Sequence, residues 1–489
     1  MARTRRPVIR PRRSAFAAAF LSFVFPGLGH AYLRRWGRAL MWGLLPVIAL
    51  AALIGLAIGP ARSEVVIGLI QPDMLIVILL VLAVDLLYRM ASLVDAWFQA
   101  RDRSVGSPMT RAFSSVGALA IVLVLVVSHV ALAQPVLFVY DAFRSYEAAG
   151  GDASELPSVE DLGPAFAHLA EPPGPGDDVG PRSDRSTDAA DDVLAGEPWK
   201  GTERLDILLI GADGGRRGSS TYLTDTMIVV SVDPGTGRVA FISLPRDTAG
   251  VPLPAGWDAR RVYGATFGPK INTLYTTARL QPDLFPGGAA QRGYRALMGA
   301  LSELYGLEIR YYVAVDLRGF RGAVNALGGI AVDIRTPLKD SAYPSDDGRG
   351  KLNLYEKPGI RTMNGQQALA FARSRKSTSD FDRAARQQLL VAALRDQLDL
   401  DALLRPGVID QLFKELRTHV KTNIPPRMLP QLVTLARDVD LKKRASLVLS
   451  SGKGYSTVCN GCQADGQYKL IPNVQKIRRA VQNVFQRAG

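Results

Sequence analysis

The first 140 residues of the chain alternate long apolar runs with short basic segments. The run from Ala39 to Ile58 has no charged side chain over twenty positions, which is enough to cross the hydrocarbon core of a bilayer. A second apolar stretch lies within about Val66 to Phe98, and a third, from Ala112 to Tyr140, is uncharged. This pattern predicts a transmembrane region of about three helices over residues 39–140.

An apolar segment before these runs has a different pattern. Residues 1–38 read as a basic N-terminus, and within them Ser14 to Leu33 is apolar but interrupted by Pro26-Gly27-Leu28-Gly29. Proline and glycine both disfavour a continuous helix. We therefore expect a re-entrant or interfacial segment here, and not a full membrane span.

The basic residues predict the orientation of the spans. Arginines gather before Ala39 and over residues 101–111, whereas the stretch 59–73 holds only Arg62. Because basic loops stay on the cytoplasmic side, three spans place the chain after residue 140 outside the cell. Asp85 falls within the second run, where a carboxylate is costly in lipid, so we expect it to face other helices or water.

The composition changes after the third run. Residues 141–203 are acidic and rich in proline and glycine, as in Pro172-Pro173-Gly174-Pro175-Gly176. Such a sequence cannot bury a core and is typical of a flexible, self-repelling linker. We predict an extracytoplasmic linker here.

From Asp206 onward the pattern is that of a folded α/β domain. Short runs rich in Val and Ile predict strands buried on both faces, and mixing them with helices favours an α/β/α sandwich. We expect its core at residues 204–400, followed by a mostly helical part at 401–489 with a loop around the cysteines. The expected strands are Ile207–Ile210, Met227–Val232, Val239–Leu244, Tyr312–Val315 and Ile330–Ile334, and the expected helices are Tyr294–Tyr305 and Phe381–Leu398.

Charge and rare residues exclude several functions. The net charge of +14 comes largely from arginines beside the apolar runs, and no nucleic-acid-binding motif is present, so we expect a membrane and no nucleic acid as partner. Between Gly201 and Leu400 there is no His or Cys, which argues against Ser-His-Asp, Cys-His and zinc centres there. The two cysteines, Cys459 and Cys462, favour a small structural disulfide in an oxidising compartment.

Acidic and basic residues stand where the predicted strands end. Asp213 follows the first strand, Asp225 leads into the second, and Arg246 and Asp247 follow the third. Side chains at strand ends can converge, and two converging carboxylates favour a hard cation such as Mg²⁺ or Mn²⁺. Each of these aspartates taken alone also fits a turn or a helix cap.

A second cluster contains Arg373, Arg375, Asp380, Arg383 and Gln387. A helix from about Phe381 puts Arg383 and Gln387 on one face, and Arg373 and Arg375, if extended, point the same way. Guanidinium groups bind phosphate bidentately. A solvated helix face would show the same local pattern, but the two clusters together predict a diphosphate held by arginines and a metal.

At these residues the chain resembles the LytR-CpsA-Psr family of cell-wall glycopolymer ligases. The resemblance covers about 185 residues, and the ordered set of motifs is specific although each motif alone is not. The matching stretches are Asp206 to Asp213, Thr224 to Met227, Ile242 to Thr248, Lys270 to Asn272, Ala326 to Ile330, Asn364 to Arg375, Asp380 to Arg383 and Arg386 to Gln388.

The resemblance implies a membrane-tethered extracytoplasmic α/β/α domain with a mixed central sheet. It would transfer a glycopolymer from a polyprenyl-pyrophosphate carrier, with the lipid tail in an apolar pocket, to a hydroxyl of peptidoglycan. Asp247 would orient Arg246 or deprotonate the acceptor, and Asp380 is a second base candidate. By motif matching, Asp213 and Asp225 would hold Mg²⁺ or Mn²⁺, and Arg246, Arg373, Arg375, Arg383 and Gln387 would contact the diphosphate.

The chain departs from the family pattern in three places. Family members usually have one N-terminal span, whereas three are predicted here. An arginine that often follows the first motif is shifted, as Arg216 and Arg217, and a common glycine in the last motif is Asp382. Two alternatives stay open: a polyprenyl-diphosphate hydrolase, in which water is the acceptor, and a non-enzymatic membrane regulator or scaffold.

Overall fold

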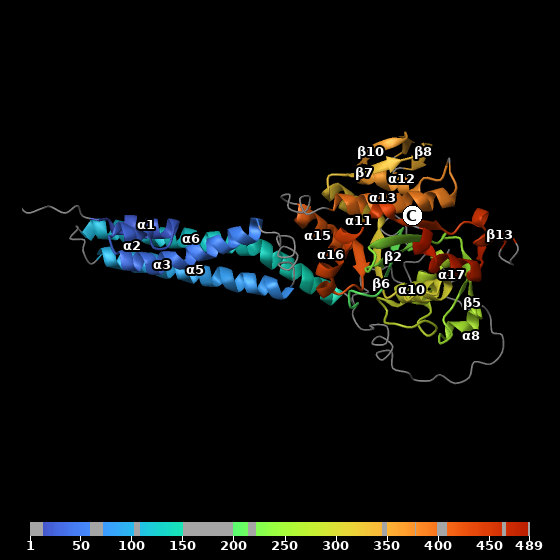
Figure 1. Cartoon of the computed structure of the whole chain (residues 1–489), viewed down its shortest axis with the longest axis horizontal. Coiled ribbons are helices and arrows are strands. Elements are labelled where there is room, and N and C mark those ends of the chain that lie inside the picture. The colour runs from blue at the N-terminus through green and yellow to red at the C-terminus, as the bar shows by residue number, and fades with distance from the viewer. Residues whose placement is uncertain are drawn as a thin grey trace, which may run out of the picture. The chain divides into compact units, whose positions relative to one another are not determined.

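The structure is a computed structural model of the chain. It describes residues 13–58, 72–101, 108–149, 199–213, 222–344, 350–376, 378–398, 408–461 and 466–487. The chain divides into two compact units, Met1–Arg144 and Ser145–Gly489 (Figure 1). The first contains the predicted membrane region and the second the predicted α/β domain. Most of the predicted linker lies outside the described residues.

The first unit is built from helices. Among the described residues, three helices are long and apolar enough to cross a membrane, over Trp36–Gly55, Asp73–Arg101 and Ser114–Leu137. The three apolar runs are therefore helical as predicted, and their insertion in a membrane stays a prediction. The helices are α1 (Ala15–Val24), α2 (Leu28–Tyr32), α3 (Trp36–Ile58), α5 (Pro72–Arg101) and α6 (Pro108–Ala149).

Helices α1 and α2 are separated where the sequence predicted a break. Gly27 precedes α2 with a φ of +94°, a left-handed conformation that glycine adopts without strain. A Cβ at Gly27 would lie 2.5 Å from the carbonyl oxygen of Ala39 on α3, so the close approach of α3 also requires glycine. The break is confirmed, and its re-entrant or interfacial location stays a prediction.

One carboxylate links α2, α3 and α5. Oδ1 of Asp95 accepts hydrogen bonds from Arg38 Nη1 and Gln99 Nε2, both at 2.8 Å. Oδ2 accepts from Trp42 Nε1 at 3.1 Å and lies 2.9 Å from His30 Nε2. A carboxylate among apolar helices is costly unless it is paired, so this cluster holds the three helices in one arrangement.

Asp85 has partners within the same unit, as the sequence predicted. Its Oδ2 accepts from Arg89 Nε at 2.7 Å, one turn along α5, and lies 3.1 Å from His129 Nε2 on α6. Asp85 therefore faces a neighbouring helix.

The second unit is centred on a six-stranded mixed sheet. The strand order is β11-β6-β1-β2-β3-β12, with β1 parallel to β6 and β3 parallel to β12, while the other neighbours are antiparallel. The predicted strands Ile207–Ile210, Met227–Val232, Val239–Leu244 and Tyr312–Val315 all lie in it. The strands are β1 (Leu205–Ala212), β2 (Thr224–Asp233), β3 (Arg238–Ser243), β6 (Tyr311–Asp316), β11 (Val420–Thr422) and β12 (Ala445–Val448).

Helices cover both faces of this sheet, because successive side chains of a strand point to opposite sides. Leu208 and Ile210 of β1 pack into a core with α9, α10 and α17, whereas Ile207 and Leu209 pack against α13 and α16. This confirms the α/β/α sandwich with a mixed sheet. The helices are α8 (Ala259–Tyr263), α9 (Leu274–Leu280), α10 (Arg292–Tyr305), α13 (Asp380–Gln397), α16 (Leu429–Asp438) and α17 (Val474–Gln482).

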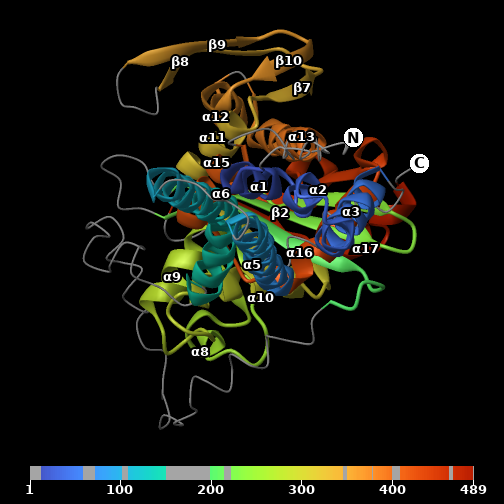
Figure 2. The ribbon, with the colours of Figure 1, turned by 90° about the vertical axis from the view of Figure 1, so that its left-hand side faces the viewer.

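Smaller elements surround the sandwich. Two two-stranded sheets, β10-β7 and β8-β9, lie over α11, α12 and α13 (Figure 2). The predicted strand Ile330–Ile334 is thus formed, but it pairs outside the central sheet. These elements are α11 (Leu317–Ala326), α12 (Gly365–Arg373), β7 (Ile330–Ile334), β8 (Leu338–Pro344), β9 (Lys351–Glu356) and β10 (Gly359–Met363), with β4 (Ala249–Pro252) and β5 (Thr266–Lys270) forming a further pair.

The C-terminal part contributes strands as well as the expected helices. Besides α15 (Val408–His419), α16 and α17, it supplies β11 and β12 at the two edges of the central sheet. It also forms a separate hairpin, β13 (Ser456–Asn460) with β14 (Tyr468–Pro472). Cys459 of β13 is disulfide-bonded, as predicted, and Cys462 lies outside the described residues.

Candidate active site

The first two predicted carboxylates lie at one end of the central sheet. Asp213 directly follows β1, and its backbone N–H and Oδ1 bond Leu223 O and Leu223 N at 3.0 and 2.8 Å. Asp225 lies on the adjacent strand β2, between Thr224 and Thr226. These two residues pair with Ala212 and Gly211 of β1, so the register shifts at Asp225. A bulge at a strand end redirects side chains, so both aspartates are placed at the same rim of the sheet.

Asp225 is the centre of a cluster built from three further segments. Its Oδ2 accepts from Arg246 Nη1 at 2.7 Å, and its Oδ1 accepts from Asn272 Nδ2 at 3.3 Å. Its backbone carbonyl accepts from Arg383 Nη2 at 3.3 Å. The structure therefore brings together Asp225, Arg246 and Arg383, which lie up to 158 positions apart in the chain.

Asp247 extends this cluster on the loop between β3 and β4. Its Oδ1 lies 2.8 Å from Lys270 Nζ, and its Oδ2 lies 3.8 Å from Arg246 Nε. Lys270 begins one of the matching motifs, to which the sequence assigned no role. It provides the cation that holds Asp247 in place.

The start of α13 carries Asp380 and Arg383 of the second predicted cluster. Ser379 caps the helix, and the Asp382 carboxylate accepts back from the Ser379 backbone at 2.9 Å, which forms a capping box. Asp382, the residue that departs from the family pattern, therefore stabilises the helix start. One turn of helix then sets Arg383 Nη2 3.0 Å from Asp380 Oδ1, and Arg375 Nη1 lies 3.8 Å from the same oxygen.

The guanidinium groups of the cluster influence one another. Burial lowers the pKa of Arg383, with Asp380 opposing the shift and Arg246 reinforcing it. Burial also acts to lower the pKa of Arg246, but the carboxylates of Asp225, Asp247 and Asp380 outweigh it, so the pKa is raised. Since the ordinary pKa of arginine is far above neutrality, both groups are cationic at physiological pH.

Several buried polar atoms of the cluster have no hydrogen-bond partner in the described chain. They are Arg246 Nε, Arg383 Nε, Asn272 Oδ1 and Asp380 Oδ1, of which Arg246 Nε and Asp380 Oδ1 lie within ion-pair distance of Asp247 and Arg383 but without hydrogen-bond geometry. Unpaired buried polar atoms are few in native proteins, and each calls for an explanation. Here two donors and two acceptors stand within one cluster, which suits a ligand with phosphate oxygens and a cation.

Arg373 and Gln387 are placed differently from the other predicted ligands. Arg373 is the last residue of α12, so it is not part of an extended segment with Arg375, and its Nη1 donates to Tyr343 Oη at 3.3 Å. Gln387 Nε2 donates to the carbonyl of Ala372 at 3.4 Å. The expectation that Arg373 and Arg375 share one extended direction is therefore wrong. Arg216 and Arg217 lie outside the described residues.

Arg386, which belongs to the last matching motif, has a packing role in the structure. Its Nε donates to the Phe371 carbonyl and its Nη1 to Thr378 Oγ1, both at 2.9 Å, while Nη2 bonds the carbonyl of Ser374. Burial lowers the pKa of Arg386 to about 10. Arg386 thus ties α13 to the end of α12 and fixes the segment that carries Arg375.

The two predicted metal ligands, Asp213 and Asp225, stand at the ends of the adjacent strands β1 and β2. Within the described ranges, no cluster of three or more His, Cys, Asp or Glu could hold a metal ion. Mg²⁺ is commonly bound by one or two carboxylates together with substrate phosphates, so a pair is sufficient. The unpaired Oδ1 of Asn272, whose amide bonds Asp225, adds an uncharged oxygen to this donor set. The residues present therefore fit a hard cation.

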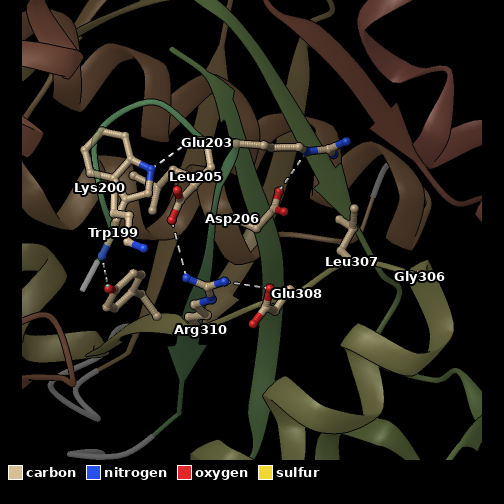
Figure 3. Close-up of a pocket in the computed structure, with 11 residues that line it drawn as sticks. Trp199, Lys200, Glu203, Leu205, Asp206, Gly306, Leu307, Glu308 and Arg310 are labelled. Carbon is tan, nitrogen blue, oxygen red and sulfur yellow. Dashed lines mark hydrogen bonds and ion pairs between the residues drawn. The ribbon is translucent and has the colours of Figure 1, made fainter. Parts of the chain in front are cut away.

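A cavity of about 630 Å³ lies at the other end of β1 (Figure 3). Its charged residues pair with one another: Arg310 with Glu308 at 2.7 Å, and Arg204 with Asp206 at 3.2 Å. The eight residues of β1 separate it from Asp213 by roughly 25 Å. This cavity is therefore separate from the Asp225 cluster.

Comparison with known proteins places the chain in a family. A model described as the LytR_cpsA_psr family matches residues 180–482, which is more than half of the chain. The chain belongs to the LytR_cpsA_psr family. The family that the motifs resemble is thereby confirmed.

Curated LytR-CpsA-Psr relatives carry transferase names. TagU of Oceanobacillus iheyensis, a polyisoprenyl-teichoic acid–peptidoglycan teichoic acid transferase, is 28% identical over 240 residues, covering 48% of this chain and 64% of TagU. TagV of Bacillus subtilis, with the same transferase name, is 29% identical over 226 residues, covering 45% of this chain and 49% of TagV. The matches thus span between about half and two thirds of these relatives' own length.

Solved structures of LytR-CpsA-Psr proteins are also similar. The crystal structure of TagV from B. subtilis has a TM-score of 0.40 at 24% identity and covers 58% of this chain and 98% of that chain. A structure of TagT bound to LIIa-WTA has a TM-score of 0.42 at 20% identity and covers 60% of this chain and 96% of that chain.

Proposed function

We propose that this protein is a membrane-anchored extracytoplasmic phosphotransferase that moves a glycopolymer from a polyprenyl-pyrophosphate carrier to a hydroxyl of peptidoglycan. The observation that carries the proposal is the cluster of Asp225, Arg246, Arg383 and Asp380 at one end of the central sheet. Phosphoryl transfer needs positioning and charge neutralisation more than covalent chemistry, and this cluster supplies both. The transferase names of TagU and TagV support the same reaction class.

The diphosphate would be bound by the guanidinium groups. Arg246 and Arg383 each keep a buried Nε–H without a partner, and an Nε–H with a neighbouring Nη–H forms the fork that binds phosphate bidentately. Arg375 is 50% exposed, so it can close on a ligand that arrives from solvent. Arg373 and Gln387, held by Tyr343 and Ala372, would act farther along the donor.

Asp213 and Asp225 would hold Mg²⁺ or Mn²⁺, with Asn272 beside them. The bound cation would neutralise charge on the diphosphate. Asp225 already bonds Arg246, so a metal ion bound there would share this carboxylate with the guanidinium group. The negative charge of the diphosphate would offset the repulsion between the two cations. We therefore expect metal binding and diphosphate binding to reinforce each other.

Two carboxylates could deprotonate the acceptor hydroxyl. Asp247 is bound by Lys270. Asp380 accepts from Arg383 through Oδ2, and its buried Oδ1 lies 3.0 Å from the same guanidinium without hydrogen-bond geometry. Separate Asp247→Asn and Asp380→Asn variants distinguish them, because loss of the general base lowers kcat more than it raises the KM of the donor.

The proposal is tested with full-length protein, a radiolabelled lipid-linked polymer and isolated peptidoglycan. We expect label to become attached to the insoluble wall, and Arg246→Ala to slow this transfer by roughly 100- to 1,000-fold, as for removal of one transition-state donor. Arg261→Ala is the matched control, because Arg261 is 67% exposed and pairs with Asp258.

Other outcomes decide against the proposal. Label that is released but stays soluble in the presence of peptidoglycan indicates a polyprenyl-diphosphate hydrolase. The absence of both transfer and release of label with the parent protein favours a regulator or scaffold. Full activity of Arg246→Ala contradicts the proposed site, because Arg246 bonds Asp225 directly.

A further inference from the structure

The hairpin β13–β14 lies beside the proposed active site although it comes from the C-terminal end of the chain. Its strands, Ser456–Asn460 and Tyr468–Pro472, pair in antiparallel register with Asn460 opposite Tyr468. The disulfide-bonded Cys459 lies in the first strand, opposite Lys469. None of the motifs in the sequence includes this hairpin.

The hairpin is bonded directly to the loop that carries Asp247. The backbone N–H of Leu470 donates to the carbonyl of Asp247 at 3.0 Å, and Leu470 forms a parallel bridge with Thr248. Lys469 is only 3% exposed, and its Nζ lies 3.5 Å from the carbonyl of Gly268 on β5. A buried ammonium and a backbone hydrogen bond hold β14 in a fixed position against this loop.

This docking places one large aromatic side chain beside the loop that carries Asp247. Tyr468 is 43% exposed at the start of β14, two residues before Leu470, whose backbone N–H bonds the Asp247 carbonyl. Burial of part of the ring raises the pKa of Tyr468, and the charges of Asp247 and Asp380 raise it further. Arg246 and Arg383 contact the same two carboxylates.

An acceptor hydroxyl must reach one of these carboxylates while the arginines hold the donor. If Arg246 and Arg383 bind the donor diphosphate, the acceptor hydroxyl approaches Asp247 or Asp380 past Tyr468. Sugars of a glycan present apolar C–H faces that pack on aromatic rings, while their hydroxyls need polar partners. A half-exposed ring paired with an asparagine supplies both.

We propose that Tyr468 is an acceptor-binding residue whose ring packs against a sugar of the peptidoglycan chain, and that the β13–β14 hairpin forms the acceptor side of the site. The proposal rests on the proposed function, because it assumes a sugar hydroxyl as acceptor. Leu470 and Lys469 are positioning residues, since they fix the hairpin on the Asp247 loop.

The test measures KM separately for donor and acceptor with the full-length protein. Tyr468→Ala should raise the KM for peptidoglycan about tenfold, as expected for loss of one aromatic contact, while the KM for the lipid-linked donor changes less than about twofold. Tyr468→Phe keeps the ring and should restore most of the acceptor affinity. Tyr355→Ala is the matched control, because Tyr355 is 54% exposed on β9.

A second measurement tests acceptor binding directly, without requiring transfer activity. Soluble peptidoglycan glycan fragments are titrated into full-length protein by calorimetry, and Tyr468→Ala should weaken their binding by a similar factor, about tenfold. Fragment binding that depends on Tyr468 without any transfer would support this site and remove the proposed function. Equal fragment binding by Tyr468→Ala and the parent protein overturns the inference, whether or not transfer occurs.

Discussion

Each unit of the chain surrounds a carboxylate with cations and hydrogen-bond donors. The two arrangements differ in which hydrogen-bonding groups are left without a partner and could bind a ligand. In the helical unit, both oxygens of Asp95 are occupied by side chains from α2, α3 and α5. In the α/β domain, Asp225 also has partners, but its neighbours Arg246 and Arg383 keep unpaired buried Nε atoms, and the adjoining Arg375 is half exposed.

Unpaired buried atoms alone do not make this distinction. His30 of the helical cluster is fully buried and its Nδ1 has no hydrogen-bond partner in the described chain. Exposure does not make it either, because Arg38 is 48% exposed and Arg375 is 50% exposed. The difference is chemical: the α/β cluster keeps two guanidinium Nε–H groups, which can bind phosphate, whereas the helical cluster keeps an imidazole nitrogen and the Gln99 amide oxygen. We infer that Asp95 holds helices together, whereas Asp225 belongs to the site that we propose for a charged ligand.

Replacing an arginine of the α/β cluster should have the largest effect. Arg383→Ala removes the link between the Asp225 carbonyl and Asp380, so we expect transfer to fall by roughly 100- to 1,000-fold. The measurement is the rate of label transfer to peptidoglycan. Arg478→Ala serves as control, because Arg478 pairs with Glu303 on the surface. A loss below about fivefold would remove Arg383 from the site.

Breaking the helical cluster should affect stability and not transfer. Asp95→Ala leaves the buried His30 without its partner, and an unsatisfied buried polar group costs about 1–3 kcal/mol, whereas the half-exposed Arg38 can bond water instead. We expect a lower midpoint of thermal unfolding for the full-length protein in detergent, at unchanged transfer rate below that midpoint. Equal unfolding curves for variant and parent would contradict the structural role of Asp95.

Removing one charge from the predicted metal pair should have an intermediate effect. Asp225→Asn keeps the size of the side chain but weakens metal coordination, so we expect about 10- to 100-fold weaker Mg²⁺ affinity. Calorimetric titration of Mg²⁺ into the full-length protein measures it. If variant and parent bind Mg²⁺ equally well, Asp225 is not a metal ligand.

The smallest effect is expected at the capping box that starts α13. Ser379→Ala removes the cap and should cost about 1 kcal/mol of folding free energy, measured by denaturant unfolding. Hydrogen bonds from the Ser379 side chain and backbone lower the pKa of Asp382, so this stabilisation is present above the unfolded pKa of about 4 and is lost as the pH falls through the lower folded value. The variant should therefore be less sensitive to acid than the parent, and unchanged acid sensitivity would contradict this account.

Much of the central sheet could be predicted because its strands are continuous apolar runs. Met227–Val232 is largely buried on both faces, and Ile207–Ile210 is buried on one face and partly buried on the other, so both segments consist mostly of apolar residues. The edge strands β11 and β12 have three and four residues, which is too short for a periodic signal. They depend on contacts with β6 and β3, which local sequence does not encode.

The site was predictable as far as strand ends and helix spacing determine it. Asp225 and Arg246 stand at strand ends, and the contact between Asp380 and Arg383 follows from their separation of three residues in a helix. The partner of Arg373 and the docking of Leu470 on Asp247 join segments that no local pattern connects. These contacts could be found only in the folded domain.

The most direct test of the central claim is to measure, by calorimetry, the binding of a short-chain isoprenyl diphosphate to the full-length protein. The titration is done with and without Mg²⁺. The account predicts that binding is tighter with Mg²⁺, prefers the diphosphate over the matching monophosphate, and is weakened about tenfold or more by Arg246→Ala but not by Arg261→Ala. Equal binding of the diphosphate by the parent protein and Arg246→Ala would contradict it.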